Sequence, residues 1–127
     1  MDEEKNILEL QAAKDELNKL ISYRENLMMI YRELKQSLES LSILSTEDPV
    51  LLPIGSGIFL ESKINNKNFV LVGVGSNIFL EMETEKAKEF LKKRIKKVEE
   101  EIVEVQTYIQ NFQYYILNVL EHIKRKK

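Results

Sequence analysis

A short motif occurs twice in the middle of the chain, and a long heptad segment lies on each side of it. Residues 54–61 read IGSGIFLE, and residues 74–81 read VGSNIFLE. Each copy places a turn that contains glycine between apolar residues that favour strands, which predicts a β-hairpin. The pattern therefore predicts two helices whose ends are joined by two hairpins. We interpret this arrangement as one suited to binding other polypeptides rather than to transforming a small molecule.

Both flanking segments carry apolar residues at alternating spacings of three and four. The N-terminal seam is Leu10, Ala13, Leu17, Leu20, Arg24, Leu27, Tyr31, Leu34, Leu38 and Leu41. The C-terminal seam is Leu91, Ile95, Val98, Ile102, Val105, Ile109, Phe112, Ile116, Val119 and Ile123. A period near 3.5 residues is typical of coiled-coil helices. Only Arg24 interrupts the seams, and we interpret it as a register-setting polar residue within reach of Glu101 or Glu104.

The turn residues set the expected limits of the helices. The first helix is expected over residues 1–46, because Pro49 disfavours a helical conformation at the preceding residue. The second is expected over residues 84–125, with Thr84 as its N-cap and Glu85 in an acidic first turn. Each helix then measures roughly 60 Å at 1.5 Å per residue. Their similar lengths predict an antiparallel pair.

Residues 50–82 are expected to form the two hairpins, with Pro53 in an edge strand. Four such short strands cannot close a barrel alone, so their open edges predict pairing with other chains. The fold class is therefore α+β: a long antiparallel two-helix coiled coil with two central β-hairpins that join an oligomeric β-barrel platform. The residues expected in this oligomerisation surface are Leu52, Ile54, Ile58, Phe59, Val70, Val72, Ile78 and Phe79.

Composition and motifs argue against several classes of function. The 127 residues suit a single domain, and a net charge of −2 without a one-sided basic stripe argues against nucleic-acid binding. The chain has no cysteine, no membrane-length apolar run and an acidic start unlike a signal peptide. We therefore expect a cytoplasmic protein with no membrane partner.

No pattern in the sequence predicts a catalytic, cofactor or metal site, so we expect no enzyme activity. The glycine motifs complete neither phosphate-loop pattern, and we interpret them as hairpin turns. His122 is the only histidine and has no recognisable cluster of metal ligands around it. Ser56 and Ser76 lack a positioned general base. The basic residues 124–127 suit a helix C-terminus, although a binding role stays open.

The free ends of the two helices are more apolar than a coiled-coil seam requires. The residues expected to contact clients there are Ile7, Leu8, Leu10, Tyr114, Leu117, Leu120 and Ile123. An apolar patch at this end is suited to holding exposed hydrophobic segments of other chains. The same surplus is also compatible with packing against a neighbouring subunit or with a wider seam. Residues 27–31, with Met28 and Met29, leave the same alternatives open.

The order helix, two hairpins, helix resembles the archaeal prefoldin alpha subunit. The resemblance rests on LPIGSG at residues 52–57, on VLVGVGSN at residues 70–77 followed by Glu81, and on Ala87, Phe90 and Ile95. Asn77 stands where that family usually has glycine. The two hairpins suggest the alpha type rather than the beta type.

The resemblance implies an ATP-independent chaperone in which two alpha-type and four beta-type subunits join their hairpins into a platform. Its helical arms would capture unfolded or nascent polypeptides at their tips and deliver them to a group II chaperonin. An alpha paralogue that assembles with itself, as a coiled-coil scaffold or filament without client transfer, is the alternative. A closed assembly favours the chaperone, and open-ended polymers favour the scaffold.

Overall fold

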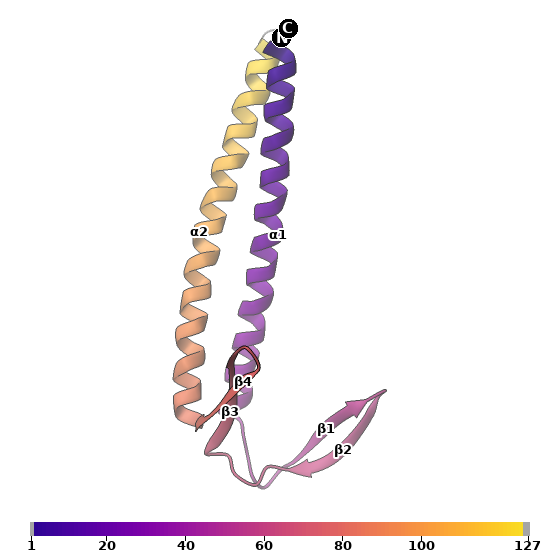
Figure 1. The fold of residues 1–127 in the computed structure, drawn as a ribbon, viewed down its shortest axis with the longest axis vertical. Coiled ribbons are helices and arrows are strands. Elements are labelled where there is room, and N and C mark those ends of the chain that lie inside the picture. The colour runs from indigo at the N-terminus through magenta and orange to yellow at the C-terminus, as the bar shows by residue number, and fades with distance from the viewer. Residues whose placement is uncertain (1, 126–127) are drawn as a thin grey trace. The chain divides into compact units, whose positions relative to one another are not determined.

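The computed structural model describes residues 2–125, which form two long helices with four strands between them (Figure 1). Helix α1 spans Asp2–Ser42 and helix α2 spans Thr84–Arg125. The strands are β1 (Pro49–Gly55), β2 (Ile58–Lys63), β3 (Phe69–Gly75) and β4 (Ile78–Glu83). This element order confirms the predicted α+β fold class. The β-barrel platform in that prediction would be formed by several chains and is not part of the fold of a single chain.

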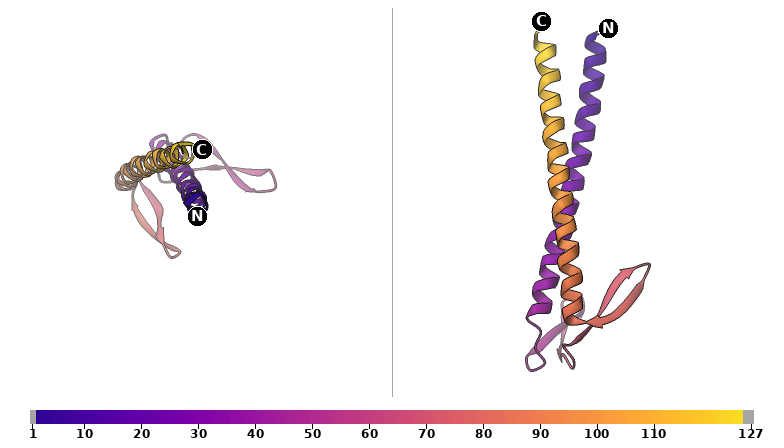
Figure 2. Two further views of the ribbon diagram at one scale, coloured as in Figure 1. Left: turned by 90° about the horizontal axis from the view of Figure 1, so that it is seen from above. Right: turned by 90° about the vertical axis from the view of Figure 1, so that its left-hand side faces the viewer.

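The chain divides into two compact units. The first comprises residues 1–32 and 96–127, and the second comprises residues 33–95. In the first unit the segments of α1 and α2 run side by side in opposite directions (Figures 1 and 2). The second unit contains the C-terminal end of α1, both hairpins and the N-terminal end of α2.

The core of the first unit is the predicted seam. Leu27, Val105 and Ile109 form a buried cluster, against which Leu17, Leu20, Ile21, Val98 and Ile102 pack. Ala13 and Ile116, one from each helix, are both buried as well. Every residue of the two predicted seams, in both units, is buried or half-buried. Hydrophobic spacing thus selected most of the residues that the helices bury. Thr84 and Ala87, at the start of α2, are buried outside the seams.

Helix α1 ends at Ser42, not at residue 46 as expected. The Ser42 hydroxyl donates a 2.9 Å hydrogen bond to the Leu38 carbonyl, and the Ile43 amide donates to the Ser40 carbonyl in a tighter turn. Such bonds satisfy carbonyls that the last helical turn leaves free. Residues 43–48 connect the end of α1 to strand β1, which begins at Pro49.

Each hairpin is an independent two-stranded antiparallel sheet. Among the described residues, strand β1 pairs only with β2 and β3 pairs only with β4, so all four strands are edge strands. The predicted turns are confirmed: Ser56 and Gly57, like Ser76 and Asn77, all have positive φ, as a type I′ turn requires. Asn77 therefore adopts the left-handed conformation that a glycine would take. The positive φ of the two serines was not expected.

Candidate interaction surfaces

The first candidate surface is the end of the first unit where α1 begins and α2 ends. Both views in Figure 2 place these two helix termini at the same end of the antiparallel pair. This end therefore brings together residues 7–10 and residues 114–123, as the sequence predicts. We call it the arm tip.

The arm tip divides the predicted client residues into two groups. Ile7, Leu8, Tyr114 and Leu117 are exposed, with 69% of Tyr114 and 59% of Leu117 accessible. Leu10, Leu120 and Ile123 are half-buried, and Leu10 and Ile123 are seam positions. The first group is thus available to another molecule. The second group supports the pairing of the helices.

Two further exposed residues of α2 extend this surface beyond the predicted set, namely Tyr108 and Tyr115. No charged side chain occurs between Glu104 and Glu121, and glutamine, asparagine and tyrosine fill the outward positions. This uncharged segment is visible in the sequence, but the analysis of heptad spacing did not use it. It leaves the outer face of α2 without the charges that normally keep a helix surface solvated.

The second candidate surface is formed by the hairpins. Every residue of β1 and β2 is exposed, including the predicted residues Leu52, Ile54, Ile58 and Phe59. In the other hairpin Ile78 and Phe79 are exposed, whereas Val70 and Val72 are half-buried. Further exposed apolar residues that the prediction did not name are Val50, Leu51, Leu60, Phe69, Leu71, Val74 and Leu80.

The two faces of each hairpin follow from its register. Leu52 lies opposite Leu60, and Val72 lies opposite Leu80, so these residues share one face of their respective sheets. Phe59 and Phe79 lie on the other faces, opposite Pro53 and Gly73.

In the described part of the chain, nothing covers either face of β1–β2, although its strands are rich in leucine, isoleucine and phenylalanine. A two-stranded sheet of this kind is at best marginally stable alone in water. Its apolar faces therefore need cover from another molecule.

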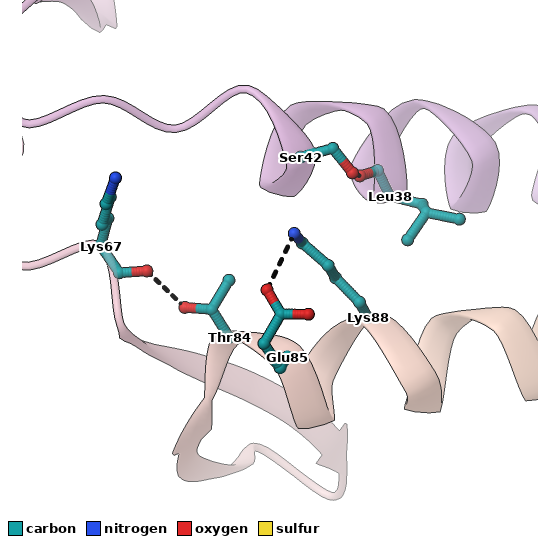
Figure 3. Close-up of polar contacts among 6 residues, drawn as sticks. All are labelled: Leu38, Ser42, Lys67, Thr84, Glu85 and Lys88. Carbon is teal, nitrogen blue, oxygen red and sulfur yellow. Dashed lines mark hydrogen bonds and ion pairs between the residues drawn. The ribbon is translucent and has the colours of Figure 1, made fainter.

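Polar contacts in the second unit join the β2–β3 loop to the start of α2 (Figure 3). The Thr84 hydroxyl donates a 2.6 Å hydrogen bond to the Lys67 carbonyl. The Thr84 amide donates to the Asn68 carbonyl at 2.8 Å. Thr84 was expected to cap α2 with its side chain. Its hydroxyl instead bonds to a separate loop. Glu85 and Lys88 form an exposed ion pair of 3.1 Å beside it.

A hollow of about 490 Å³ lies beside these contacts. Its lining includes Leu41, Leu44, Phe69 and the Glu85–Lys88 pair. The lining thus combines apolar side chains with the charged residues Lys67, Glu83, Glu85 and Lys88. Within residues 2–125 no group of three or more histidine or acidic side chains is placed to hold a metal ion.

The seam contains one polar side chain whose bonding differs from expectation. The Nε of Arg24 is buried and has no hydrogen-bond partner in the described part of the chain. The ion pair with Glu101 or Glu104 that its position suggested is not observed.

The fold and these surfaces define a class of protein: a coiled-coil hairpin subunit with exposed β-hairpins for assembly. A family model described as Prefoldin subunit matches residues 4–127. The chain belongs to the prefoldin family.

Among solved structures, the chain is similar to filamentous PFD from Methanocaldococcus jannaschii, determined by cryo-EM. The similarity has a TM-score of 0.71 and 28% sequence identity, and it covers 87% of this chain and 94% of that one. No curated protein matches the sequence. Among the described residues, neither helix contains a stretch long and apolar enough to cross a membrane.

Proposed function

We propose that this protein is an alpha-type subunit of an ATP-independent chaperone. It captures non-native polypeptides at the arm tip and delivers them to a group II chaperonin. The observation that carries the proposal is the exposed apolar surface of the arm tip, where Tyr114 and Leu117 present more than half of their surface to solvent. Membership of a chaperone family and the two hairpins in one chain support it.

To capture different clients, this surface must accept many sequences rather than fit one ligand in a shaped pocket. Tyrosine and leucine side chains contact many apolar sequences, and neighbouring asparagine and glutamine groups hydrogen-bond to an extended backbone without demanding one partner. Each arm then binds weakly, and several arms in one assembly bind a single unfolded chain with useful avidity. Release needs no nucleotide, because each individual contact is weak.

Aggregation of a chemically denatured client, followed by light scattering, tests the proposal. Leu117→Glu places a charge in the arm tip, and we expect it to abolish the suppression seen with the wild-type chain. Val103→Glu is the matched control, because Val103 is equally exposed on the same helix but lies outside the arm tip. Helicity and assembled mass should be unchanged in both variants. Full suppression by Leu117→Glu would overturn the assignment of the arm tip.

A second candidate function is a scaffold that assembles with itself into filaments and transfers no client. The similarity to a filamentous prefoldin favours it specifically. Mass measurement of the chain, alone and with a beta-type subunit, separates the two functions. A closed hexamer of two alpha-type and four beta-type subunits supports the chaperone. Open-ended polymers of this chain alone support the scaffold.

A further inference from the structure

Both helices carry a second apolar column beside the seam. Tyr23 and Ile30 of α1 lie seven residues apart, as do Tyr108 and Tyr115 of α2, and each of the four follows a seam residue by three. In a heptad this is a position that flanks the seam. Apolar residues there, in addition to the two seam positions, are typical of helices that pack in a bundle rather than only in a pair.

The exposed fractions of these four side chains agree with a flanking position. Each of the four is 39–49% exposed. Apolar residues at the outward positions of the same helices are more exposed, at 53–69%, namely Met29, Val103, Tyr114 and Leu117. The four flanking side chains are thus partly covered by the helix pair, and much of each remains available to another molecule.

The two columns flank the same side of the helix pair. All four residues belong to the first unit, in which α1 and α2 run antiparallel (Figure 2). Two antiparallel helices that share one seam are related by an approximate two-fold axis, so equivalent heptad positions flank the same side of the seam. Tyr23, Ile30, Tyr108 and Tyr115 therefore form one apolar stripe along the pair. We call it the side stripe.

The ends of the side stripe are acidic. Glu16 and Glu101 occupy the same heptad position as the stripe, one heptad before the first apolar residue of their column. Because the helices are antiparallel, Glu16 lies toward the arm tip and Glu101 lies toward the opposite end of the stripe. The next outward positions along the two columns hold residues whose charges cancel, namely Lys19, Asn26, Glu104 and Asn111. The stripe thus combines an apolar middle with a negative charge toward each end.

We propose that the side stripe binds amphipathic helical segments of non-native polypeptides whose two ends carry lysine or arginine. The proposal deepens client capture by the helical arms and rests on that proposed function. A helix suits the stripe because its apolar face repeats with the same spacing of seven. An extended strand would need an open sheet edge for its backbone hydrogen bonds, which a pair of helices does not offer. Basic ends complement Glu16 and Glu101.

The length of the side stripe sets the size of the segment that it binds. Each column extends over seven residues, which is roughly 10 Å at 1.5 Å per residue. A client helix of about two to three turns therefore covers the stripe. A contact of this size is weak by itself, and several arms acting on one client supply the avidity.

Fluorescence anisotropy with three labelled synthetic peptides tests the proposal on the wild-type protein. The first peptide is an amphipathic helix with leucines on one face and lysines at both ends. The second has glutamates in place of those lysines, and the third has a proline at its centre. We expect the first to bind at least about tenfold more tightly than either of the others. Equal affinity for the first peptide and either of the others, or no binding of the first, would overturn the proposal.

Alanine substitution locates the surface that binds the lysine-ended peptide. Tyr108→Ala removes a ring of the side stripe without disturbing the helix, and it should weaken binding at least about fivefold. Tyr108→Phe keeps the ring and should bind like wild type. Val103→Ala is the matched control, because Val103 is exposed on the same helix outside the stripe. Helicity by circular dichroism confirms that each variant keeps its fold, and equal binding by Tyr108→Ala and wild type would contradict the proposal.

Removal of the two acidic ends tests the charge preference separately. The double variant Glu16→Gln, Glu101→Gln keeps the size of both side chains. It should bind the lysine-ended and glutamate-ended peptides with affinities within about twofold of each other. A double variant that still prefers the lysine-ended peptide tenfold would show that other residues make the choice and would overturn the assignment.

The remaining outcomes separate this proposal from the proposed function. If Leu117→Glu abolishes suppression of aggregation while Tyr108→Ala binds the peptide like wild type, the arm tip stands and the side stripe is wrong. The reverse pair of results supports the side stripe and removes the arm tip. If Tyr108→Ala lowers the assembled mass, the stripe is covered by a second copy of this chain, and the proposal is wrong.

Discussion

The hydroxyl of Thr84 donates a 2.6 Å hydrogen bond to the backbone carbonyl of Lys67, seventeen residues earlier in the chain. Thr84 is the first residue of α2 and is only 6% exposed. The adjacent backbone bond from Thr84 to Asn68 extends the β3–β4 ladder by one pair. One residue therefore ends the hairpin, begins the helix and holds the loop that leads into β3.

Thr84→Val should destabilise this junction. Valine keeps the branched shape and the backbone bond to Asn68, but it leaves the Lys67 carbonyl without its donor. The expected loss is about 1–2 kcal/mol. Urea unfolding followed by circular dichroism measures it, together with exchange of the β3–β4 amides. Thr84→Ser retains the hydroxyl and should stay close to wild type. Equal stability of Thr84→Val and wild type would show that the bond contributes nothing.

Ile109→Ala should be strongly destabilising because Ile109 is 3% exposed and packs with Leu27 and Val105. Truncation removes buried methyl groups and leaves a cavity between two rigid helices, which costs about 2–5 kcal/mol. Val103→Ala, at a position 62% exposed on the same helix, should change stability by less than about 0.5 kcal/mol. Comparable urea midpoints for the two variants would contradict the assignment of the seam.

The helices and their buried faces were predictable because the signal is repeated along the chain. Each seam carries ten positions with one spacing, so a local irregularity such as Arg24 does not disturb the pattern. The hairpins were predictable from the glycine-containing turns, which demand positive φ. The end of α1 was harder. It depends on side-chain and backbone bonds at Ser42 and Ile43 rather than on Pro49.

The candidate sites were predictable only in part. An apolar surplus at the arm tip was visible in the sequence, but spacing did not separate the exposed Leu117 from the half-buried Leu120. That distinction depends on the angular position of each residue around the paired helices. The role of Thr84 was not predictable either, because its partner Lys67 lies in a loop whose position the sequence does not reveal.

Gly75→Ala should destabilise the second hairpin. Gly75 has a φ of +112°, a conformation that residues with a Cβ atom rarely adopt, although a Cβ there would contact nothing within 4 Å. The penalty is therefore one of backbone strain alone, about 1–3 kcal/mol.

Amide exchange in β3 and β4 reports this change better than global unfolding, since the helices dominate the latter. Asn77→Gly is the matched control, because Asn77 has a φ of +59° that glycine adopts freely. Its hairpin should be at least as protected as that of wild type. Unchanged exchange in Gly75→Ala would mean that the turn relaxes to another conformation at little cost.

Arg24→Leu should stabilise the coiled coil and weaken its specificity. The buried Arg24 Nε has no hydrogen-bond partner among residues 2–125, so its desolvation is uncompensated. Replacing it with a seam leucine removes that cost and adds apolar contact, which should raise stability by about 1–3 kcal/mol in urea unfolding. A polar seam residue also disfavours alternative registers and partners. The variant should therefore form additional species in mass measurements, whereas Arg24→Lys should not. A less stable Arg24→Leu would show that the guanidinium gains more from its other contacts than its Nε loses.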